Sequence, residues 1–353
     1  MALAVLSVAY PFAPVRPDTA GGAEHVLALL DRALVKAGHR SVVVACRGSE
    51  VEGLLVESPW SGKEGVMITA GIRRSVQEQQ RLEIHRALES HDIGLVHMHG
   101  IDFDCYMPQP GVPVLATLHL PLPWYSPEAL KPKRPGTYLH CVSASQRAAC
   151  PAGVALLPDI ENGVPVERLR TKVGKRDFVI SLGRICPEKG FHIALDAAGR
   201  AGTAMLLAGE VYPYEAHAQY YSGEILPRID GRRRRFIGPI GFERKRRLLT
   251  AARCLLVPSL VPETSSLAAM EALACGTPVV AFPAGALADI VEDGRTGFLV
   301  HDEYEMSEAI GAALSLDPGE CRRAARERFS SDAMTGRYFE LYERLSLESP
   351  VQS

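Results

Sequence analysis

The chain has 353 residues, more than one ordinary hydrophobic core organises, and this length suits two domains of about 150 residues each. Lysine and arginine total 39 against 41 aspartates and glutamates, a balance that excludes a globally basic nucleic-acid binder and a long acidic tail. The eight cysteines are scattered without a CxxC pair, so the pattern signals neither a zinc site nor a disulfide framework and favours the reducing cytosol.

The first residues, MALAVLSVAYPFAP, predict a buried strand rather than a targeting segment. No basic residue precedes the apolar run, and proline interrupts it after about ten positions, too few for a membrane span. Further short apolar runs, SVVVAC, IGLVHMH, VPVLATLH and TYLHCVSAS, alternate with longer segments such as the helix-periodic GAEHVLALLDRALVKAGH. This alternation predicts a domain of parallel βαβ units over residues 1–168.

A charged stretch punctuated by glycine and proline, ENGVPVERLRTKVGKRD, predicts a domain boundary near residues 168–177. Strand-like runs then restart with FVISLG, TAMLLAG, RFIG, CLLVPSL, TPVVAF and GFLV. Residues 169–330 are therefore expected to form a second parallel α/β domain. The last helical run, residues 332–347, has an apolar face that needs a packing partner, for which the first domain is the candidate.

Two doubly wound domains in one chain usually bind a ligand in the cleft between them, where strand carboxyl ends and helix N termini meet. In PETSSLAAMEALACGTPVVAF, Glu263 follows a predicted strand, and Thr264 or Ser265 is expected to cap the next helix. The unpaired N–H groups of its first turn, around residues 266–268, favour an anion such as phosphate.

Glu271 lies on the flank of the apolar face of this predicted helix. A carboxylate there costs free energy unless its oxygens find donors. Either the side chain rotates to solvent or pairs with an arginine, or it accepts hydrogen bonds from a vicinal diol such as a ribose. From Glu263 to Glu271 a helix advances roughly 10 Å. A sugar, a diphosphate and a ribose fit along that line.

A second phosphate signal opens the second domain, in SLGRICPEKGFHIALDAA. Arg184 comes just after a strand and Lys189 just before a helix, so a bidentate fork and a point charge are expected to converge on one anion. Surface charges on a loop are the alternative interpretation. The P-loop pattern is absent, and the lack of GxGxxG after either first strand disfavours a Rossmann dehydrogenase.

The segments GRICPEKGF, PETSSLAAMEALACGTPVVAF and GALADIVEDGRTGFLV resemble the carboxyl-terminal domain of glycosyltransferase family 4. In the first half, GGAEHVLALLDRALVKAGH, LVHMHG, VLATLH and ENGVP resemble that family's first glycine-rich loop, its histidine-bearing strands and its interdomain turn. The resemblance covers nearly the whole chain in order. It implies the GT-B fold, in which two Rossmann-like doubly wound parallel-sheet domains face a central cleft.

The resemblance also implies roles for the acidic and basic residues. Glu263 is expected to contact hydroxyls of a donor sugar, and Glu271 to hold the nucleotide ribose. Arg184 and Lys189 are expected to neutralise the diphosphate leaving group, a role that metal ions play in other transferases. No DxD motif follows a strand at a matching place, so neither a metal nor another cofactor is expected.

The remaining site residues implied by the resemblance belong to three groups. Donor binding is expected from the glycine-rich loop, the first turn of the helix before Glu271 and the segment near the base, that is, from Gly21, Gly22, Ser265, Ser266, Leu267, Gly238 and Ile240. His119 is expected beside the donor sugar. His99 and Glu24 are assigned to the acceptor side, although Glu24 in a first helical turn also complements the helix dipole.

Two features have plainer alternatives. His97 and His99 share a strand face, as a metal pair does, yet the sequence offers no third ligand. The run Arg228–Arg253 holds ten lysines and arginines against two acids, Asp230 and Glu243. Such a run is usually a solvated face, but it can also attract anionic lipid or the nucleotide.

The sequence therefore predicts a retaining, metal-independent glycosyltransferase that moves a sugar from a nucleotide-diphosphate sugar to an unidentified hydroxyl acceptor. An epimerase of nucleotide-diphosphate sugars or a phosphorylase of the same fold is the alternative within the class, and a catalytically silent nucleotide-sugar-binding protein is the alternative outside it. No nucleic-acid partner is expected. A cytoplasmic location, with peripheral contact at the inner face of the membrane, follows from the cysteines and the basic run.

Overall fold

The computed structural model describes residues 2–16, 21–60 and 68–347, which form two compact units. The first unit comprises Met1–Glu161 together with Asp332–Ser353, and the second comprises Asn162–Ser331. Residues 162–168, which the sequence analysis places in the first domain, therefore belong to the second unit. None of the described helices is long and apolar enough to cross a membrane.

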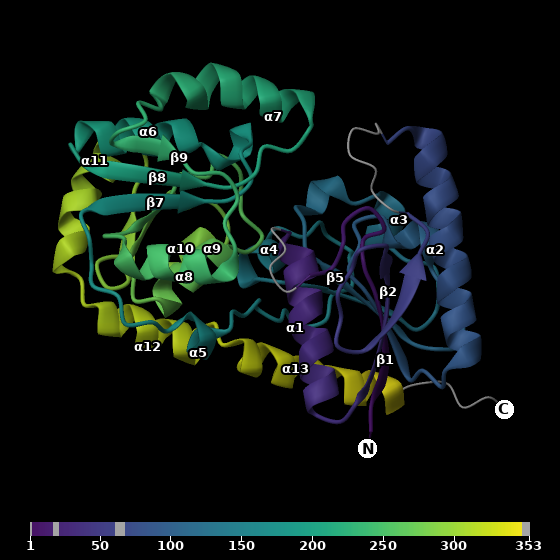
Figure 1. Cartoon of the computed structure of the whole chain (residues 1–353). Helices are drawn as coiled ribbons and strands as arrows, with labels where there is room; N and C mark the ends of the chain where they lie inside the picture. The colour runs from purple at the N-terminus through teal and green to yellow at the C-terminus, as the bar shows by residue number, and fades with distance from the viewer. Residues whose placement is uncertain (1, 17–20, 61–67, 348–353) are drawn as a thin grey trace. The chain divides into compact units, whose positions relative to one another are not determined.

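The first unit is built on a six-stranded sheet of order β3-β2-β1-β4-β5-β6 (Figure 1). All neighbouring strands are parallel, with Val5 of β1 level with Ser41 of β2 and with Leu95 of β4. The strands are β1 Ala4–Val8, β2 Arg40–Cys46, β3 Leu54–Ser58, β4 Leu95–Met98, β5 Val114–Leu118 and β6 Thr137–Cys141. Of these, only β3 is missing from the sequence prediction.

Both faces of this sheet are covered, as a parallel sheet requires. Successive residues of β1 alternate between the two faces of the sheet. Leu6 therefore lies on the face that α2 covers, and Val5 on the face that α1 covers. The helices of the unit are α1 Gly22–Lys36, α2 Ala70–Ser90, α3 Pro127–Leu130, α4 Ala144–Ala148 and α13 Ser331–Leu347, with 3₁₀ turns η1 Phe103–Tyr106 and η2 Leu122–Trp124.

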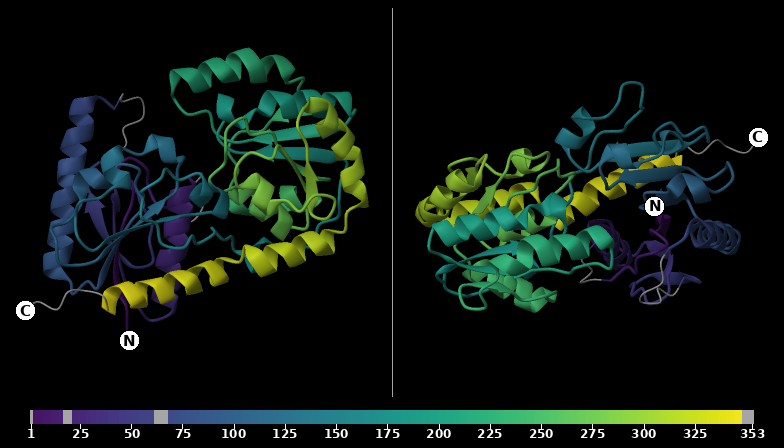
Figure 2. Two further views of the ribbon diagram at one scale, coloured as in Figure 1. Left: turned by 180° about the vertical axis from the view of Figure 1, so that it is seen from behind. Right: turned by 90° about the horizontal axis from the view of Figure 1, so that it is seen from above.

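Helix α13 follows the whole second unit in the chain, yet it packs on the sheet of the first unit (Figure 2). Tyr338, Leu341, Tyr342 and Leu345 are buried against Val5 and the apolar stripe of α1. Burying a large apolar side chain stabilises a fold by about 1.5 to 3 kcal/mol, which explains why the helix needs this partner.

The second unit repeats the arrangement with a parallel sheet of order β12-β11-β10-β7-β8-β9. Its strands are β7 Phe178–Leu182, β8 Ala204–Ala208, β9 Arg234–Phe236, β10 Leu255–Val257, β11 Val279–Ala281 and β12 Gly297–Leu299. Each of the six runs expected from the sequence forms one of these strands.

Helices cover the two faces of the second sheet in separate groups, with α6, α7 and α11 on one side and α8, α9 and α10 on the other (Figure 1). The bounds are α5 Val166–Leu169, α6 Phe191–Arg200, α7 Glu215–Tyr220, α8 Phe242–Ala251, α9 Leu267–Ala274, α10 Leu287–Ile290, α11 Glu303–Ala312 and α12 Pro318–Arg328. Short turns are η3 Pro187–Lys189, η4 Tyr221–Ile225, which is π-helical, η5 Leu226–Arg228 and η6 Ala313–Ser315.

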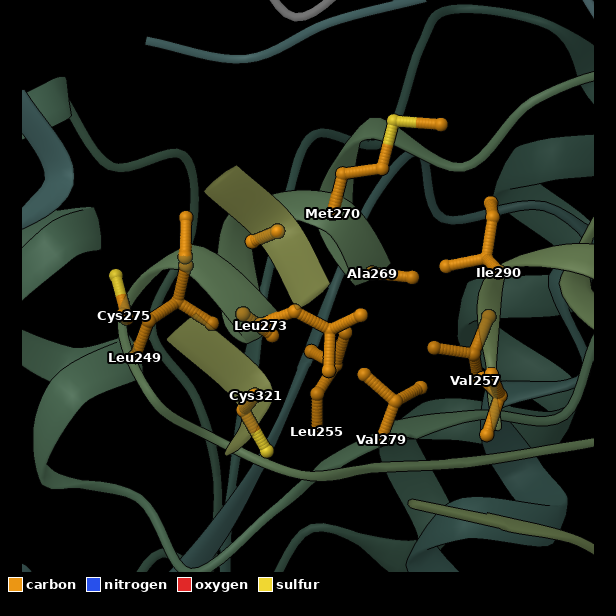
Figure 3. Packing of buried hydrophobic residues seen from close by; sticks show 14 of the residues in the cluster. Leu249, Leu255, Val257, Ala269, Met270, Leu273, Cys275, Val279, Ile290 and Cys321 are labelled. Atoms are coloured by element: carbon orange, nitrogen blue, oxygen red, sulfur yellow. The ribbon is translucent and has the colours of Figure 1, made fainter. Parts of the chain in front are cut away.

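Helix α9 is the centre of one of these cores. Figure 3 shows Ala269, Met270 and Leu273 of α9 against Leu255 of β10 and Val279 of β11. This packing fixes α9 on the sheet, so the segment that leads into α9 is held at the carboxyl end of β10.

Candidate active site

The two sheets share the doubly wound topology. In each unit the first and fourth strands lie side by side, and the strand order runs outward from them in opposite directions. In the second unit these strands are β7 and β10. Ligands bind outside the carboxyl ends of strands at such a switch point. Arg184 and Lys189 follow β7, and Glu263 follows β10. The topology thus brings the predicted phosphate and sugar residues to one edge of the sheet.

Lys189 and Glu263 form an ion pair at this edge, with 2.6 Å between Nζ and Oε1. Both side chains are largely buried, at 24% and 11% exposure. The Ser259 hydroxyl donates to the same carboxylate oxygen. The sequence analysis treats the two residues separately, one at the diphosphate and one at the sugar, whereas the structure joins them directly.

Glu263 is held by backbone pairing rather than by a helix. Its N–H donates to Ala284 O at 3.2 Å, and its carbonyl oxygen accepts from Ala286 N at 2.8 Å. Gly285, at φ +61°, makes this approach possible, because a Cβ there would lie 2.4 Å from the Glu263 carbonyl oxygen. The expectation that a helix runs from Glu263 to Glu271 is therefore wrong, since α9 begins at Leu267.

The start of α9 also differs from the expected one. Its N-cap is Ser266 rather than Thr264 or Ser265, and the Ser266 side chain makes no capping hydrogen bond. The Ser265 hydroxyl is inaccessible to solvent and lacks a hydrogen-bond partner among the described residues. Uncapped N–H groups and an orphaned hydroxyl are what an anionic ligand would satisfy.

Glu271 lies in the second turn of α9 and is 4% exposed. Its Oε1 accepts from Lys245 Nζ of α8 at 2.5 Å. The partner is thus a lysine, not the arginine or solvent of the plainer interpretation. A carboxylate accepts more than one hydrogen bond, so Oε1 can pair with Lys245 while the second oxygen of Glu271 is available to a ribose.

Arg184 is half-buried directly after β7, and among the described residues its guanidinium makes neither a hydrogen bond nor an ion pair. Glu188 attracts this guanidinium electrostatically. The five donors of the guanidinium nevertheless make no hydrogen bond among the described residues, so they are available to an anion.

Replacing Arg184 or Lys189 with alanine is expected to weaken nucleoside diphosphate binding by about 1.5 to 3 kcal/mol, because a charged hydrogen bond is lost. Nucleoside binding should change far less. Calorimetric titration with both ligands checks this, and Arg232→Ala, at an exposed position of the same unit, is the control. Equal losses for diphosphate and nucleoside would exclude a diphosphate clamp.

The two residues assigned to the base lie between β9 and α8. Gly238 has φ +67°, and its carbonyl oxygen accepts from Gly209 N at 3.0 Å. Ile240 is half-buried two residues further on. This segment therefore presents backbone groups beside the loop that follows β8, and its contact with a base stays a prediction.

In the first unit, Gly21 is the N-cap of α1 and Gly22 its first residue. A Cβ on Gly21 would lie 1.9 Å from Glu24 Oε2, so the carboxylate of Glu24 occupies the space that a side chain would need. Glu24 is 9% exposed in the first turn of α1. In this structure the Glu24 side chain thus lies against the Cα of Gly21 at the helix start.

His99 and His119 meet where β4 and β5 end. His99 Nδ1 lies 2.9 Å from His119 Nε2, and the two rings stack. Burial lowers the pKa of His119 to about 3, with a further contribution from His140. Burial, His119 and His140 hold the pKa of His99 well below its usual value. Both imidazoles are therefore neutral at pH 7, a form suited to exchanging hydrogen bonds with hydroxyls.

His97 belongs to a buried polar network instead of a metal pair. Its Nδ1 lies 2.7 Å from the Tyr342 hydroxyl and its Nε2 2.7 Å from Thr117 Oγ1. Thr117 Oγ1 also lies 2.7 Å from His140 Nε2. Because both ring nitrogens of His97 have partners, the shared strand face with His99 has a structural explanation.

Five of the ten basic residues at 228–253 form ion pairs. Arg228 pairs with Asp196 and Glu224, Arg234 with Asp230, and Lys245 with Glu271. Arg246 and Arg253 pair with Glu243 and Asp177. These partners reduce the charge that remains for a lipid surface or a nucleotide.

Sequence reasoning missed three residues that position the site, namely Lys245, Ser259 and Gly285. A signal for Lys245 was present, because it lies three residues after Phe242 and four before Leu249 on the apolar stripe of α8. A lysine on such a stripe needs a buried acceptor. Ser259 lies four residues before Glu263 in the same loop, whereas Gly285 approaches Glu263 from a separate loop, a contact that spacing does not reveal.

The comparisons with known proteins identify the class to which this doubly wound chain belongs. Residues 167–332 match the family of Glycosyl transferases group 1, and residues 20–151 match Glycosyltransferase Family 4. The chain belongs to this glycosyltransferase family. The resemblance and the GT-B fold expected from the sequence are thereby confirmed.

Individual curated proteins and solved structures are also similar to this chain. The D-inositol 3-phosphate glycosyltransferase of Mycobacterium sp. (strain KMS) is 30% identical over 266 residues, which are 73% of this chain and 50% of the relative. The chain thus spans about half the length of the first curated relatives that it matches. A glycosyltransferase involved in avilamycin A biosynthesis superposes with TM-score 0.71 at 26% identity over 98% of each chain. The Anabaena protein HepE, in complex with UDP and glucose, gives TM-score 0.71 at 18% identity over 97% of this chain and 99% of that one, a likeness of fold.

Proposed function

We propose that the chain is a retaining glycosyltransferase that moves a sugar from a nucleotide-diphosphate sugar to a hydroxyl acceptor without a metal ion. The observation that carries the proposal is the group at the β7–β10 switch point, where Arg184 and the Lys189–Glu263 pair lie at the ends of adjacent strands. Membership of the family and the UDP and glucose bound by HepE support it.

The charges of this group suit the reaction. As the bond from the sugar to the diphosphate breaks, negative charge develops on the phosphate oxygens. Arg184 and Lys189 supply positive charge there, and the uncapped start of α9 supplies N–H donors. If the acceptor attacks from the face that the diphosphate leaves, the phosphate itself can take the acceptor proton. No side-chain nucleophile is needed.

Glu263 is proposed to accept hydrogen bonds from the donor sugar, and Glu271 from the ribose. The Lys189–Glu263 pair then has two states. Without ligand, the lysine and glutamate neutralise each other. With donor bound, the lysine turns to the diphosphate and the glutamate to the sugar hydroxyls, so neither charge is left without a partner.

His119, His99 and Glu24 are proposed to contact the sugar and the acceptor from the first unit. Gly21 and Gly22 are proposed to allow close approach of the α1 start to the donor phosphate or acceptor, and Ser265, Ser266, Leu267, Gly238 and Ile240 to bind the rest of the nucleotide. A cytoplasmic site of action at the inner membrane face stays a prediction, and sedimentation with anionic vesicles tests it.

Transfer is expected to persist in excess EDTA after dialysis, because side chains and a helix start supply the stabilisation that a metal would give. The measurement is initial rate with and without EDTA. A loss of rate that Mn²⁺ or Mg²⁺ restores would show that the leaving-group chemistry is misassigned.

The function is tested by a thermal-shift screen with UDP, GDP, ADP and their sugars, followed by transfer assays with the best donor. A ligand at about 100 times its dissociation constant adds about 2.7 kcal/mol to the free energy of unfolding. Release of nucleotide diphosphate from the donor, in water or with an acceptor, supports a transferase. Binding without any turnover would favour a silent binding protein, and epimerised donor would favour an epimerase.

A further inference from the structure

The turn that carries Arg184 and Lys189 also gathers three potential metal ligands. Cys186 precedes η3, Glu188 lies within it, and His217 comes from α7. One sulfur, one carboxylate oxygen and one imidazole nitrogen all lie within 4.8 Å of one another. Over the described ranges, from residue 2 to 347 with gaps at 17–20 and 61–67, this is the one group of three such side chains.

Two of the three residues are buried, and some polar atoms of the group lack hydrogen-bond partners. Cys186 is 1% exposed and His217 is 8% exposed. Glu188 Oε2 and His217 Nδ1 are inaccessible to solvent and have no hydrogen-bond partner among the described residues. A buried polar atom without a partner costs about 1 to 3 kcal/mol, so two such atoms within one three-residue group call for an explanation.

Hydrogen bonding within the group does not supply that explanation. The Cys186 thiol has the Arg184 carbonyl oxygen 3.6 Å from its sulfur and the Glu188 carboxylate within reach. Neither contact uses the imidazole. His217 packs edge-on against Tyr214, with ring centroids 5.1 Å apart, which fixes the plane of the ring without satisfying its nitrogen.

We propose that Cys186, Glu188 and His217 bind Zn²⁺, with the fourth coordination position open to water. Sulfur, nitrogen and one carboxylate oxygen are the donors that zinc prefers, whereas Mg²⁺ and Ca²⁺ require mostly oxygen. A thiolate and a carboxylate balance the two positive charges of the ion, so no net charge is buried.

The geometry requires a small closure. Zinc-to-ligand bonds of about 2.0 to 2.3 Å place tetrahedral ligand atoms roughly 3.3 to 3.8 Å apart. Side-chain rotations that move the three ligand atoms by about 1 Å therefore bring them from their present separations to the distances that zinc requires. Two of the ligands lie on the turn between β7 and α6, so the ion would brace the turn that also carries Arg184 and Lys189. This site goes beyond the proposed transfer reaction, which does not use it.

The experiment is titration of the apoprotein with Zn²⁺ against a chromogenic chelator, with Co²⁺ as a spectroscopic substitute. Wild type is expected to bind one ion, to unfold at a higher temperature with Zn²⁺, and to show a thiolate-to-cobalt charge-transfer band. Cys186→Ser should abolish the band, and His217→Gln should weaken binding by more than the roughly 10- to 100-fold that an outer-shell loss costs.

Matched controls are Cys105→Ser, at an exposed thiol, and His192→Gln, where the imidazole is hydrogen-bonded to Tyr220. Both should bind Zn²⁺ as wild type does. The proposal is overturned if wild type binds no stoichiometric ion, or if folded Cys186→Ser and His217→Gln retain wild-type affinity. All these readouts are independent of sugar transfer, so failure of the site and failure of the proposed function are distinguishable.

Discussion

Glu263→Ala is expected to lower kcat/KM for sugar transfer by about a hundredfold, or about 2.7 kcal/mol of transition-state binding. The affinity for free nucleotide diphosphate should not fall. The substitution removes the acceptor for the sugar hydroxyls, but it also releases Lys189 from its 2.6 Å ion pair, and the freed ammonium remains available to the phosphates. Transfer kinetics and a diphosphate titration together measure the two effects.

Two other glutamates serve as comparisons. Glu271→Ala should weaken free diphosphate and donor alike, since a ribose is present in both. Glu271→Gln should accompany it, because removal of Glu271 leaves Lys245 largely buried without its partner and lowers stability as well. Glu243→Ala, at an exposed position of α8, should change neither measurement. Full transfer activity in folded Glu263→Ala would remove Glu263 from the sugar site.

The first unit is expected to lose stability steeply as the pH falls below about 6.5, the pKa of histidine in an unfolded chain. Burial lowers the pKa of His119 to about 3 and of His140 to about 4, and holds those of His97 and His99 well below the usual value. Between the folded and unfolded pKa values, the unfolded chain binds more protons than the folded one. The free energy of unfolding therefore decreases as the pH is lowered, by about 1.4 kcal/mol per pH unit for each histidine.

The sign is specific to depressed histidine pKa values. This stability is fully present above pH 6.5 and is lost on acidification towards the folded values. Urea unfolding followed from pH 7.5 to 5 checks the prediction. His140→Gln should reduce the slope of the unfolding free energy against pH by the contribution of one histidine. His85→Gln, at an exposed position of α2, should leave this slope unchanged. A flat profile in wild type would mean that the four rings are not neutral and buried together.

Much of the fold was predictable because most of its strands are buried. The runs that became β1, β2, β4, β5, β7, β8, β10 and β11 are mostly buried and apolar, which composition alone reveals. The edge strands are more exposed, and β3, with Leu54 48% exposed, was missed because its run LLVES lacks that apolar continuity. The cap of α9 was misplaced because three consecutive small polar residues qualify equally.

The candidate site divides in the same way. Motif spacing placed Arg184, Lys189 and Glu263 near strand ends and Glu271 within the following helix, since each lies in or next to a recognisable element. Their partners could not be predicted. Lys189 and Glu263 are 74 positions apart, and Lys245 and Glu271 are 26 apart. The proposed ligands Cys186, Glu188 and His217 were not predicted for the same reason, because they come from a turn and a separate helix and not from a CxxC pair.

The packing of α13 on the first unit has a consequence for how the protein is made. His97 contacts Tyr342 across 245 positions of sequence, so the core of the first unit cannot be completed until the ribosome has passed α13. The second unit is continuous and has all its strands by residue 299. During synthesis, the order of folding should therefore reverse the order of translation, because one face of the amino-terminal sheet is covered only by α1 until the last helix is made. Nascent chains stalled before α13 should be the ones that chaperones hold.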